Sequence, residues 1–339
     1  MALLDINLHS TPRYKIVLLF TALSVIAAVT GLVSLASGSV SVPFREVVDI
    51  LVRQPPGINS QIILDLRLPR VSSGFVVGGM LALAGALMQI LLRNPLAEPY
   101  ILGISGGASV FALLAISMGL AGVWLTAGAC LGALLTMFMV FTFTGAGAGW
   151  NPLKVLLTGV VIAAGWGAVI SFLLAVSPAA KLHNMLFWLM GDLSFSQPGG
   201  WYFLVLLLAV ILAMNYSRAL NLLAVGDLQA AALGVSVNRL RIFTYFLASI
   251  LTAAAVIQAG SIGFIGLIVP HGVRLLIGND NRLLLPASVF AGGILLVFAD
   301  MLARTLLAPR QLPVGVLTAL IGVPVFLLLL QSTAARQRP

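Results

Sequence analysis

The sequence predicts an all-α polytopic membrane protein with about ten transmembrane helices. Of its 339 residues, 60% are hydrophobic and only 8% are charged, whereas soluble domains are about half apolar and about a quarter charged. The apolar residues form continuous runs rather than the polar–apolar alternation of a membrane β-strand. Because a hydrocarbon core of about 30 Å takes about 20 helical residues to cross, most of these runs are long enough to span it.

Ten runs are expected to be transmembrane helices, and they cover residues 16–36, 71–92, 101–120, 123–143, 153–176, 201–216, 242–260, 262–277, 286–307 and 312–331. The first follows Arg13 and Lys15 and is longer than the core of a signal peptide, so we expect a retained helix. The eighth is short and rich in glycine and proline, and its border with the seventh is poorly marked. Residues 1–339 are expected to form one domain, because no repeat or low-complexity linker divides them.

The basic residues predict the orientation of the spans. Eleven lysines and arginines near span ends fall on the side of the N-terminus and seven on the opposite side, and basic residues favour the cytoplasmic side. The tails 1–15 and 332–339 and the polar segment 217–241 are therefore expected in the cytoplasm. This topology also accounts for the net charge of +9, so the lipid bilayer is the expected partner of these charges and nucleic acid is not.

Two long connections, 37–70 and 177–200, are expected on the outer side. Each contains an amphipathic stretch, at 44–52 and at 182–190, that predicts a short helix lying at the membrane interface. On the cytoplasmic side, Arg-Asn-Pro-Leu-Ala-Glu-Pro at 93–99 must end its helix and turn, because proline lacks an N–H and clashes with the preceding turn.

Residue types that carry catalysis or hold a cofactor are sparse. Residues 103–109 are rich in glycine but lack the lysine of a phosphate-binding loop, and close helix packing explains small residues in a span. We find no Ser-His-Asp set, metalloprotease motif or carboxylate pair, and the single Cys130 cannot form an intrachain disulfide. His183 lies near two methionines, where a haem contact is the alternative to a structural role. We expect no catalytic residue, metal or cofactor in this chain.

Asp300 is the one acid placed well inside an apolar run, and Arg304 follows it by four residues on the same helix face. An intramembrane acid is a candidate proton carrier, but the neighbouring arginine favours a structural ion pair. Arg67, Arg70 and Arg304 lie near the outer ends of spans. Guanidinium groups there suit either the carboxylates of a partner protein or interfacial anchoring.

Five blocks, in this order, resemble the FecCD-type permeases of the binding-protein-dependent ABC importers for iron siderophores, haem and cobalamin. The blocks are 67–70, 92–99 with 103–108, 226–234, 263–271 and 312–324. The resemblance implies the type II importer permease fold and a subunit of the bacterial inner membrane that transports without hydrolysing ATP itself. The implied partners are a second permease copy, usually in a homodimer, two cytoplasmic ATPase subunits that use ATP and Mg²⁺, and a solute-binding protein. Ferric siderophore is the first expectation for the substrate, with haem, cobalamin and metal oxyanions as alternatives.

The resemblance also implies functions for particular residues. The arginines that engage acidic residues of the binding protein match Arg67, Arg70 and Arg304. The inner gate matches Asn94, Pro95, Leu96, Asn151 and Pro152, although the family usually has small hydroxyl residues at the last two. The coupling contact with the ATPase matches Gly226, Asp227, Leu228, Gln229, Ala231 and Gly234. The fifth and tenth helices line the pathway, where the polar groups are Thr158, Ser171 and Thr318.

Two other classes of function are alternatives. A proton-coupled secondary transporter would use Asp300, and it would need more intramembrane ionisable residues than this one. A membrane enzyme would need catalytic groups that the sequence does not show.

Overall fold

The computed structural model describes residues 13–38, 40–145, 151–194 and 200–336, and every regular element in these ranges is helical. In chain order the elements are α1 (Arg13–Ala36), α2 (Phe44–Arg53), α3 (Ile58–Gln61), η1 (Ile62–Arg67), α4 (Leu68–Leu92), η2 (Pro99–Leu102), α5 (Ile104–Ser117), α6 (Val123–Thr144), α7 (Pro152–Val176), α8 (Ala179–Leu189), α9 (Gly200–Asn215), α10 (Ser217–Val225), α11 (Asp227–Ala232), α12 (Val237–Ala259), α13 (Ile265–Ile277), α14 (Asn281–Thr305) and α15 (Val314–Arg336). The element η1 is a π-helix and η2 is a 3-10 helix.

Each of the ten expected spans corresponds to a helix. Six helical stretches are long and apolar enough to cross a membrane, and α9 with α10 forms a further candidate that bends by 60°. The apolar helices α5, α13 and the apolar part of α15 are shorter. The two amphipathic stretches are also helical, as α2 and α8. The prediction of an all-α polytopic membrane protein is confirmed.

The helix of the second expected span begins earlier than predicted, within the connection 37–70. Residues Ile58–Leu92 form one helical stretch of 35 residues, which passes through α3, η1 and α4. The charges at Asp65, Arg67 and Arg70 end the apolar run in the sequence, because charged side chains are costly in a membrane. In the structure both arginines bind partners within the chain, so the helix continues through them.

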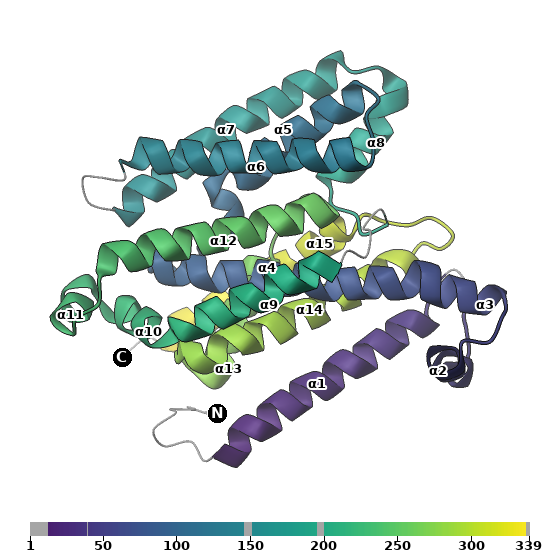
Figure 1. The fold of residues 1–339 in the computed structure, drawn as a ribbon, viewed down its shortest axis with the longest axis horizontal. Helices are drawn as coiled ribbons and strands as arrows, with labels where there is room; N and C mark the ends of the chain where they lie inside the picture. Colours follow the sequence, from purple (N-terminus) through teal and green to yellow (C-terminus); the bar gives the residue numbers. More distant parts are fainter. Residues whose placement is uncertain (1–12, 39, 146–150, 195–199, 337–339) are drawn as a thin grey trace.

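The central helix is α4. Its apolar window is 89% buried, and it packs against α12, α13 and α14. Figure 1 shows α5, α6, α7 and α8 as a separate layer above this group, with α1 along the lower side. The elements that carry the candidate sites therefore converge on α4.

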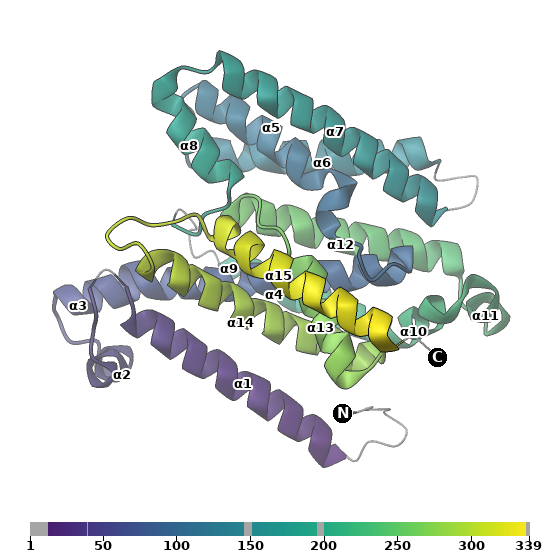
Figure 2. The same ribbon diagram turned by 180° about the vertical axis from the view of Figure 1, so that it is seen from behind.

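The two ends of the bundle are built differently. One end holds α10 and α11 together with the first residues of α1 and the last turns of α15, and the other holds α2, α3 and α8 (Figures 1 and 2). We call these the α11 end and the α2 end. The first and last spans start and finish at the same end, as an even number of spans predicts.

Helix α13 approaches α4 backbone to backbone. Pro270 has no N–H, so the carbonyl of Gly266 one turn earlier lacks its usual donor. That carbonyl faces Gly85 of α4, where an added Cβ would lie 1.8 Å from the Gly266 oxygen. The contact therefore requires a glycine at position 85.

Candidate functional site

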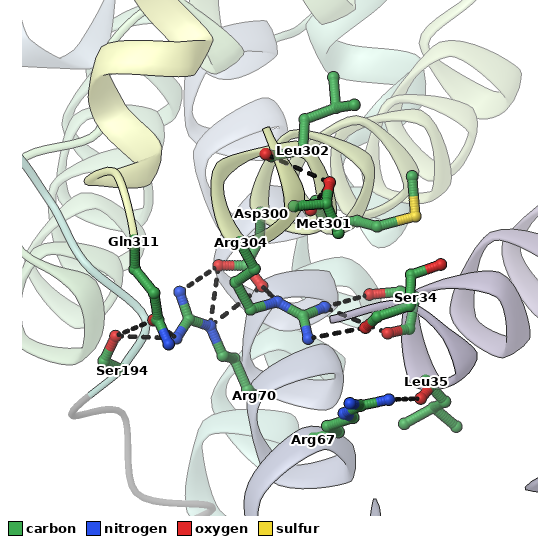
Figure 3. A network of polar contacts seen from close by, with 12 residues as sticks. Ser34, Leu35, Arg67, Arg70, Ser194, Asp300, Met301, Leu302, Arg304 and Gln311 are labelled. Atoms are coloured by element: carbon green, nitrogen blue, oxygen red, sulfur yellow. Dashed lines mark hydrogen bonds and ion pairs between the residues drawn. The ribbon is translucent and has the colours of Figure 1, made fainter. Parts of the chain in front are cut away.

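Polar residues at the α2 end form a buried network around Asp300 of α14 (Figure 3). Arg70 of α4 donates from Nε to the two carboxylate oxygens at 2.9 and 3.1 Å, and its Nη2 lies 2.8 Å from Oδ1. Arg304 donates from Nε to Oδ2 at 3.0 Å. The Asp300 side chain is 2% exposed, so one buried carboxylate serves two guanidinium groups.

The remaining donors of these two arginines bind other segments. Arg70 Nη1 donates to Ser194 Oγ at 2.8 Å and to Gln311 Oε1 at 2.9 Å. Arg304 Nη2 donates to the hydroxyl and the carbonyl oxygen of Ser34, at 2.7 and 3.2 Å. The network therefore joins α1, α4 and α14 to the loops that contain Ser194 and Gln311.

Arg67 holds the end of α1. It donates from Nη1 to the carbonyl oxygens of Leu35 at 2.6 Å and Ala36 at 3.2 Å, and from Nη2 to the carbonyl oxygen of Val40. The last carbonyls of a helix have no intrahelical donor. Arg67 supplies that donor from a neighbouring helix.

The three arginines expected to dock a binding protein are thus bound within the chain. Arg67, Arg70 and Arg304 are 5%, 8% and 6% exposed, so the structure does not show them as free groups at the surface. The interpretation of Asp300 and Arg304 as a structural ion pair is confirmed. The partnership of Arg70 with Asp300 spans 230 positions, and nothing in a single sequence indicates a contact at that separation.

At the α11 end, the carboxylate of Asp227 binds two arginines. It accepts from Arg241 Nη2 at 2.7 and 2.8 Å, and it also pairs with Arg93 Nη2. Asp227 begins α11, Arg241 belongs to α12, and Arg93 directly follows α4. This carboxylate therefore joins α4, α11 and α12. The family resemblance predicts a contact with the ATPase at Asp227 and does not predict this internal link.

A second set of hydrogen bonds fastens α10 to α14. Asn221 Nδ2 donates to Asp280 Oδ1 at 2.9 Å, and Asn221 Oδ1 accepts from the backbone N–H of Asn281 at 2.8 Å. Asp280 is the N-cap of α14. The α10–α11 segment is thus held against α4, α12 and α14.

Large apolar side chains are exposed around α11. Val225, Leu228 and Leu233 are 71%, 85% and 66% exposed, and they lie outside the ten expected spans. Exposed apolar patches mark contacts with another protein or with a membrane. The α10–α11 segment therefore presents apolar side chains at the surface of the α11 end.

Two residues expected at the inner gate shape the loops that hold them. Asn94 Oδ1 accepts from the backbone N–H of Leu96 at 2.9 Å, which closes a turn directly after α4. Asn151 Oδ1 accepts from a backbone N–H in the first turn of α7 at 2.9 Å, and Pro152 begins that helix, where proline is favoured. These local structures account for the residue types, and the gate itself stays a prediction.

The polar residues expected along the pathway differ in exposure. Ser171 is exposed on α7 and donates to the Gly167 carbonyl at 3.0 Å, and Thr158 is half-buried. Thr318 is 5% exposed and donates to the Gly315 carbonyl at 3.0 Å. The structure therefore places Thr318 inside the chain rather than on an open face of α15.

Metal-ligating side chains are scattered. Across the described ranges, no group of three or more His, Cys, Asp or Glu residues could hold a metal ion. His183 packs on Phe187, with ring centroids 4.4 Å apart, so its contact in this chain is with an aromatic ring.

Known proteins share this architecture. A model of the FecCD transport family matches residues 26–332. The chain is 43% identical over 280 residues to the hemin transport system permease protein HmuU of Yersinia pestis, covering 79% of this chain and 83% of that protein. It is 41% identical over 281 residues to the cobalamin import system permease protein BtuC of Halobacterium salinarum, covering 81% and 74%.

A solved structure shows the same fold. That structure is an inward-facing conformation of a metal-chelate type ABC transporter, and it matches with a TM-score of 0.83 and 33% identity over 93% of this chain and 99% of its own. Sequence, family model and fold thus agree over most of the chain. The chain belongs to the FecCD transport family of ABC importer permeases.

Proposed function

We propose that this chain forms the transmembrane pathway of an importer for a metal chelate, with ferric siderophore as the first candidate substrate and haem or cobalamin as alternatives. ATP hydrolysis in two partner subunits drives transport, and ATP and Mg²⁺ bind there rather than to this chain. A second copy of the permease completes the pathway. The α11 end faces the cytoplasm, and the α2 end faces a solute-binding protein.

The exposed apolar surface around α11 carries this proposal. Leu228 and Leu233 project from a segment that hydrogen bonds and ion pairs fix to α4, α12 and α14. A rigid, apolar contact outside the lipid-facing spans is what an external motor needs in order to move the membrane helices. Similarity to the permeases named for hemin and cobalamin supports the import direction and the class of substrate.

Docking of a solute-binding protein at the α2 end is supported by the charges of the network there. The network there contains three guanidinium groups and the carboxylates of Asp300 and Asp192, the latter 3.5 Å from Arg70. The surplus of positive charge favours acidic groups on a partner. Any such contact would have to share arginines that already have internal partners.

The pathway would lie between copies of α7 and α15. In α7 only 6% of the apolar window is buried within the chain, and Leu320 and Leu328 of α15 are 66% and 65% exposed. These faces carry few polar groups, and a smooth wall of this kind binds a bulky chelate weakly enough to release it.

A proton-coupled mechanism is not supported by the surroundings of Asp300. Its carboxylate is engaged by Arg70 and Arg304 at 2.8 to 3.1 Å. Both carboxylate oxygens accept hydrogen bonds from these arginines, which fits a structural role in joining α4 to α14.

Leu228→Asp is expected to abolish copurification of the ATPase subunits with the permease, because it places a charge in the apolar contact. The measurement is the stoichiometry of ATPase to permease after affinity purification. Val52→Asp is the matched control, since Val52 is 75% exposed at the α2 end and the ATPase should remain bound. Retention of the ATPase by Leu228→Asp would contradict the proposed contact.

Uptake by proteoliposomes that contain the permease, its ATPase and its binding protein tests the substrate. We expect ATP-dependent accumulation of a ferric hydroxamate in preference to haemin and cyanocobalamin at equal concentration. Preference for haemin or cyanocobalamin would replace the first candidate with that alternative. Uptake driven by a proton gradient without the ATPase would overturn the proposed energy source.

A further inference from the structure

The loop after α4 is attached to the α10–α11 segment through one side chain. Arg93 donates from Nε to the carbonyl oxygen of Leu223 at 3.1 Å, and its Nη2 pairs with Asp227. Both partners belong to the segment that we propose contacts the ATPase. The side chain of Arg93 is 35% exposed and that of Asp227 is 41% exposed, so neither bond is needed to satisfy a fully buried charge.

The backbone of Arg93 also determines how this loop begins. Arg93 ends α4 with φ of +48°, in the left-handed region that is uncommon for residues other than glycine. The turn that follows depends on this conformation: the backbone N–H of Asn94 donates to the Gln89 carbonyl at 3.2 Å, and that of Ala97 to the Asn94 carbonyl at 3.0 Å. Side-chain bonds to α10 and α11 hold Arg93 in place, so the path of residues 93–97 depends on the position of that segment.

The same loop then reaches the short connection before α13. Glu98 accepts from the backbone N–H of Phe264 at 2.6 Å, and the hydroxyl of Tyr100 accepts from the backbone N–H of Ile262 at 2.8 Å. Phe264 packs on α15, where a Cβ added to Gly322 would lie 2.7 Å from the Cβ of Phe264. A displacement of residues 98–100 therefore moves a residue that contacts α15.

Residues 101–103 contact α7 directly. A Cβ added to Gly159 of α7 would lie 2.7 Å from the Ile101 carbonyl oxygen, and one added to Gly103 would lie 3.1 Å from the backbone nitrogen of Ala163. Backbone packed on backbone leaves no flexible side chain to absorb a shift. We name residues 93–103 the connector, because they join the α10–α11 segment to both α7 and α15.

We propose that Arg93 is a positioning residue that makes the connector follow the α10–α11 segment, so that movement imposed by the ATPase reaches the two helices that line the pathway. This proposal rests on the proposed function of that segment. In this proposal Asp227 does more than contribute to the ATPase contact. Its carboxylate also holds the side chain of Arg93, the residue at which the chain turns after α4. Arg241, whose side chain is 8% exposed, binds both oxygens of the same Asp227 carboxylate.

The test uses the full complex of permease, ATPase and binding protein in proteoliposomes. Cys130 is the single cysteine of the chain, so Cys130→Ser with Leu96→Cys places one thiol in the connector, where Leu96 is 40% exposed. The readout is the rate at which a water-soluble maleimide labels this thiol, with and without ATP and vanadate. With Arg93 intact, we expect the rate to change with the nucleotide state.

Arg93→Gln is expected to leave the ATPase bound but to reduce the nucleotide-dependent change in labelling at least about five-fold, a typical size for coupling between sites. Arg93→Lys keeps the charge near Asp227 and is expected to restore part of the response. Arg239→Gln is the matched control, since it removes one positive charge from an exposed residue of α12 at the same end. In an Asp227→Asn background, Arg93→Gln should add less loss than it causes alone, because both changes break the Arg93–Asp227 pair and only the bond to Leu223 remains to be lost.

The outcomes separate this proposal from the proposed function. A full labelling response in Arg93→Gln, an equal loss in Arg239→Gln, or no nucleotide response with Arg93 intact would overturn the role of the connector. Loss of the ATPase in Leu228→Asp together with a normal response in Arg93→Gln would leave the ATPase contact standing and remove only the link. Retention of the ATPase by Leu228→Asp would instead remove the contact on which both rest.

Discussion

Asp300→Ala is expected to destabilise the protein by about 3–5 kcal/mol, the usual cost of removing one partner from a buried ion pair. The substitution leaves Arg70 and Arg304 without their shared carboxylate, at 8% and 6% exposure. It also removes the ion pair that links α14 to α4 at the α2 end. The measurement is unfolding of the purified permease in detergent, followed by tryptophan fluorescence.

Two controls separate the effect of burial from the effect of charge. Asp49→Ala breaks an ion pair of the same spacing, with Arg53 at 3.3 Å, but the two side chains are 46% and 78% exposed, so the expected cost is below about 1 kcal/mol. Replacing Arg70 and Arg304 by methionine, Asp300 by leucine and Asp192 by asparagine together removes every charge of the ion pairs around Asp300, and this variant should be more stable than Asp300→Ala. Equal stability of Asp300→Ala and the unmodified protein would show that the network does not hold the helices together.

Gly85→Ala is expected to separate α13 from α4 and to cost more than about 3 kcal/mol, beyond the usual range for an overpacked core. The added Cβ would lie 1.8, 2.5 and 2.6 Å from the oxygen, carbon and Cα of Gly266. All three are backbone atoms, so no side-chain rotation relieves the clash. The yield of monodisperse protein by size-exclusion chromatography and the unfolding midpoint are the measurements.

Gly272→Ala is the control for Gly85→Ala. It makes the same chemical change within α13, at a glycine whose added Cβ meets nothing within 4 Å. Because alanine is a better helix former than glycine, this variant should be at least as stable as the unmodified protein. Similar losses in both variants would show that the loss does not depend on the approach of the added Cβ to Gly266, and would contradict the close contact at Gly85.

The arrangement of spans could be predicted because it depends on local properties of the chain. A run of apolar residues must be helical in lipid, where every backbone N–H and C=O has to find a partner within the segment. The earlier start of the second helix, at Ile58, has a non-local cause. The charges of Arg67 and Arg70 look like the end of a span until their partners on α1 and α14 are known.

The candidate sites were predicted only in part, for the same reason. The polar segment 217–241 and the turn at 93–99 were recognised as separate features, each from its own residues and from family resemblance. Their connection through Arg93 and Asp227 crosses 134 positions. Family resemblance predicts that the tenth span, with Thr318 on it, lines the pathway, but the face on which Thr318 lies is set by packing against the rest of the chain.

The sequence by itself determined that this protein is an all-α membrane protein, where its apolar helices lie, and which family it resembles. These properties follow from hydropathy, span length and short motifs, all of which are contiguous in the chain. The tertiary structure decided which charges are partners: Asp300 with Arg70 and Arg304, and Asp227 with Arg93 and Arg241. Asp300, Arg70 and Arg304 are buried, and a buried charge is stable only beside an opposite charge or a hydrogen-bonding partner. Only the packing of α4 against α14, and of α11 against α12, brings these partners together.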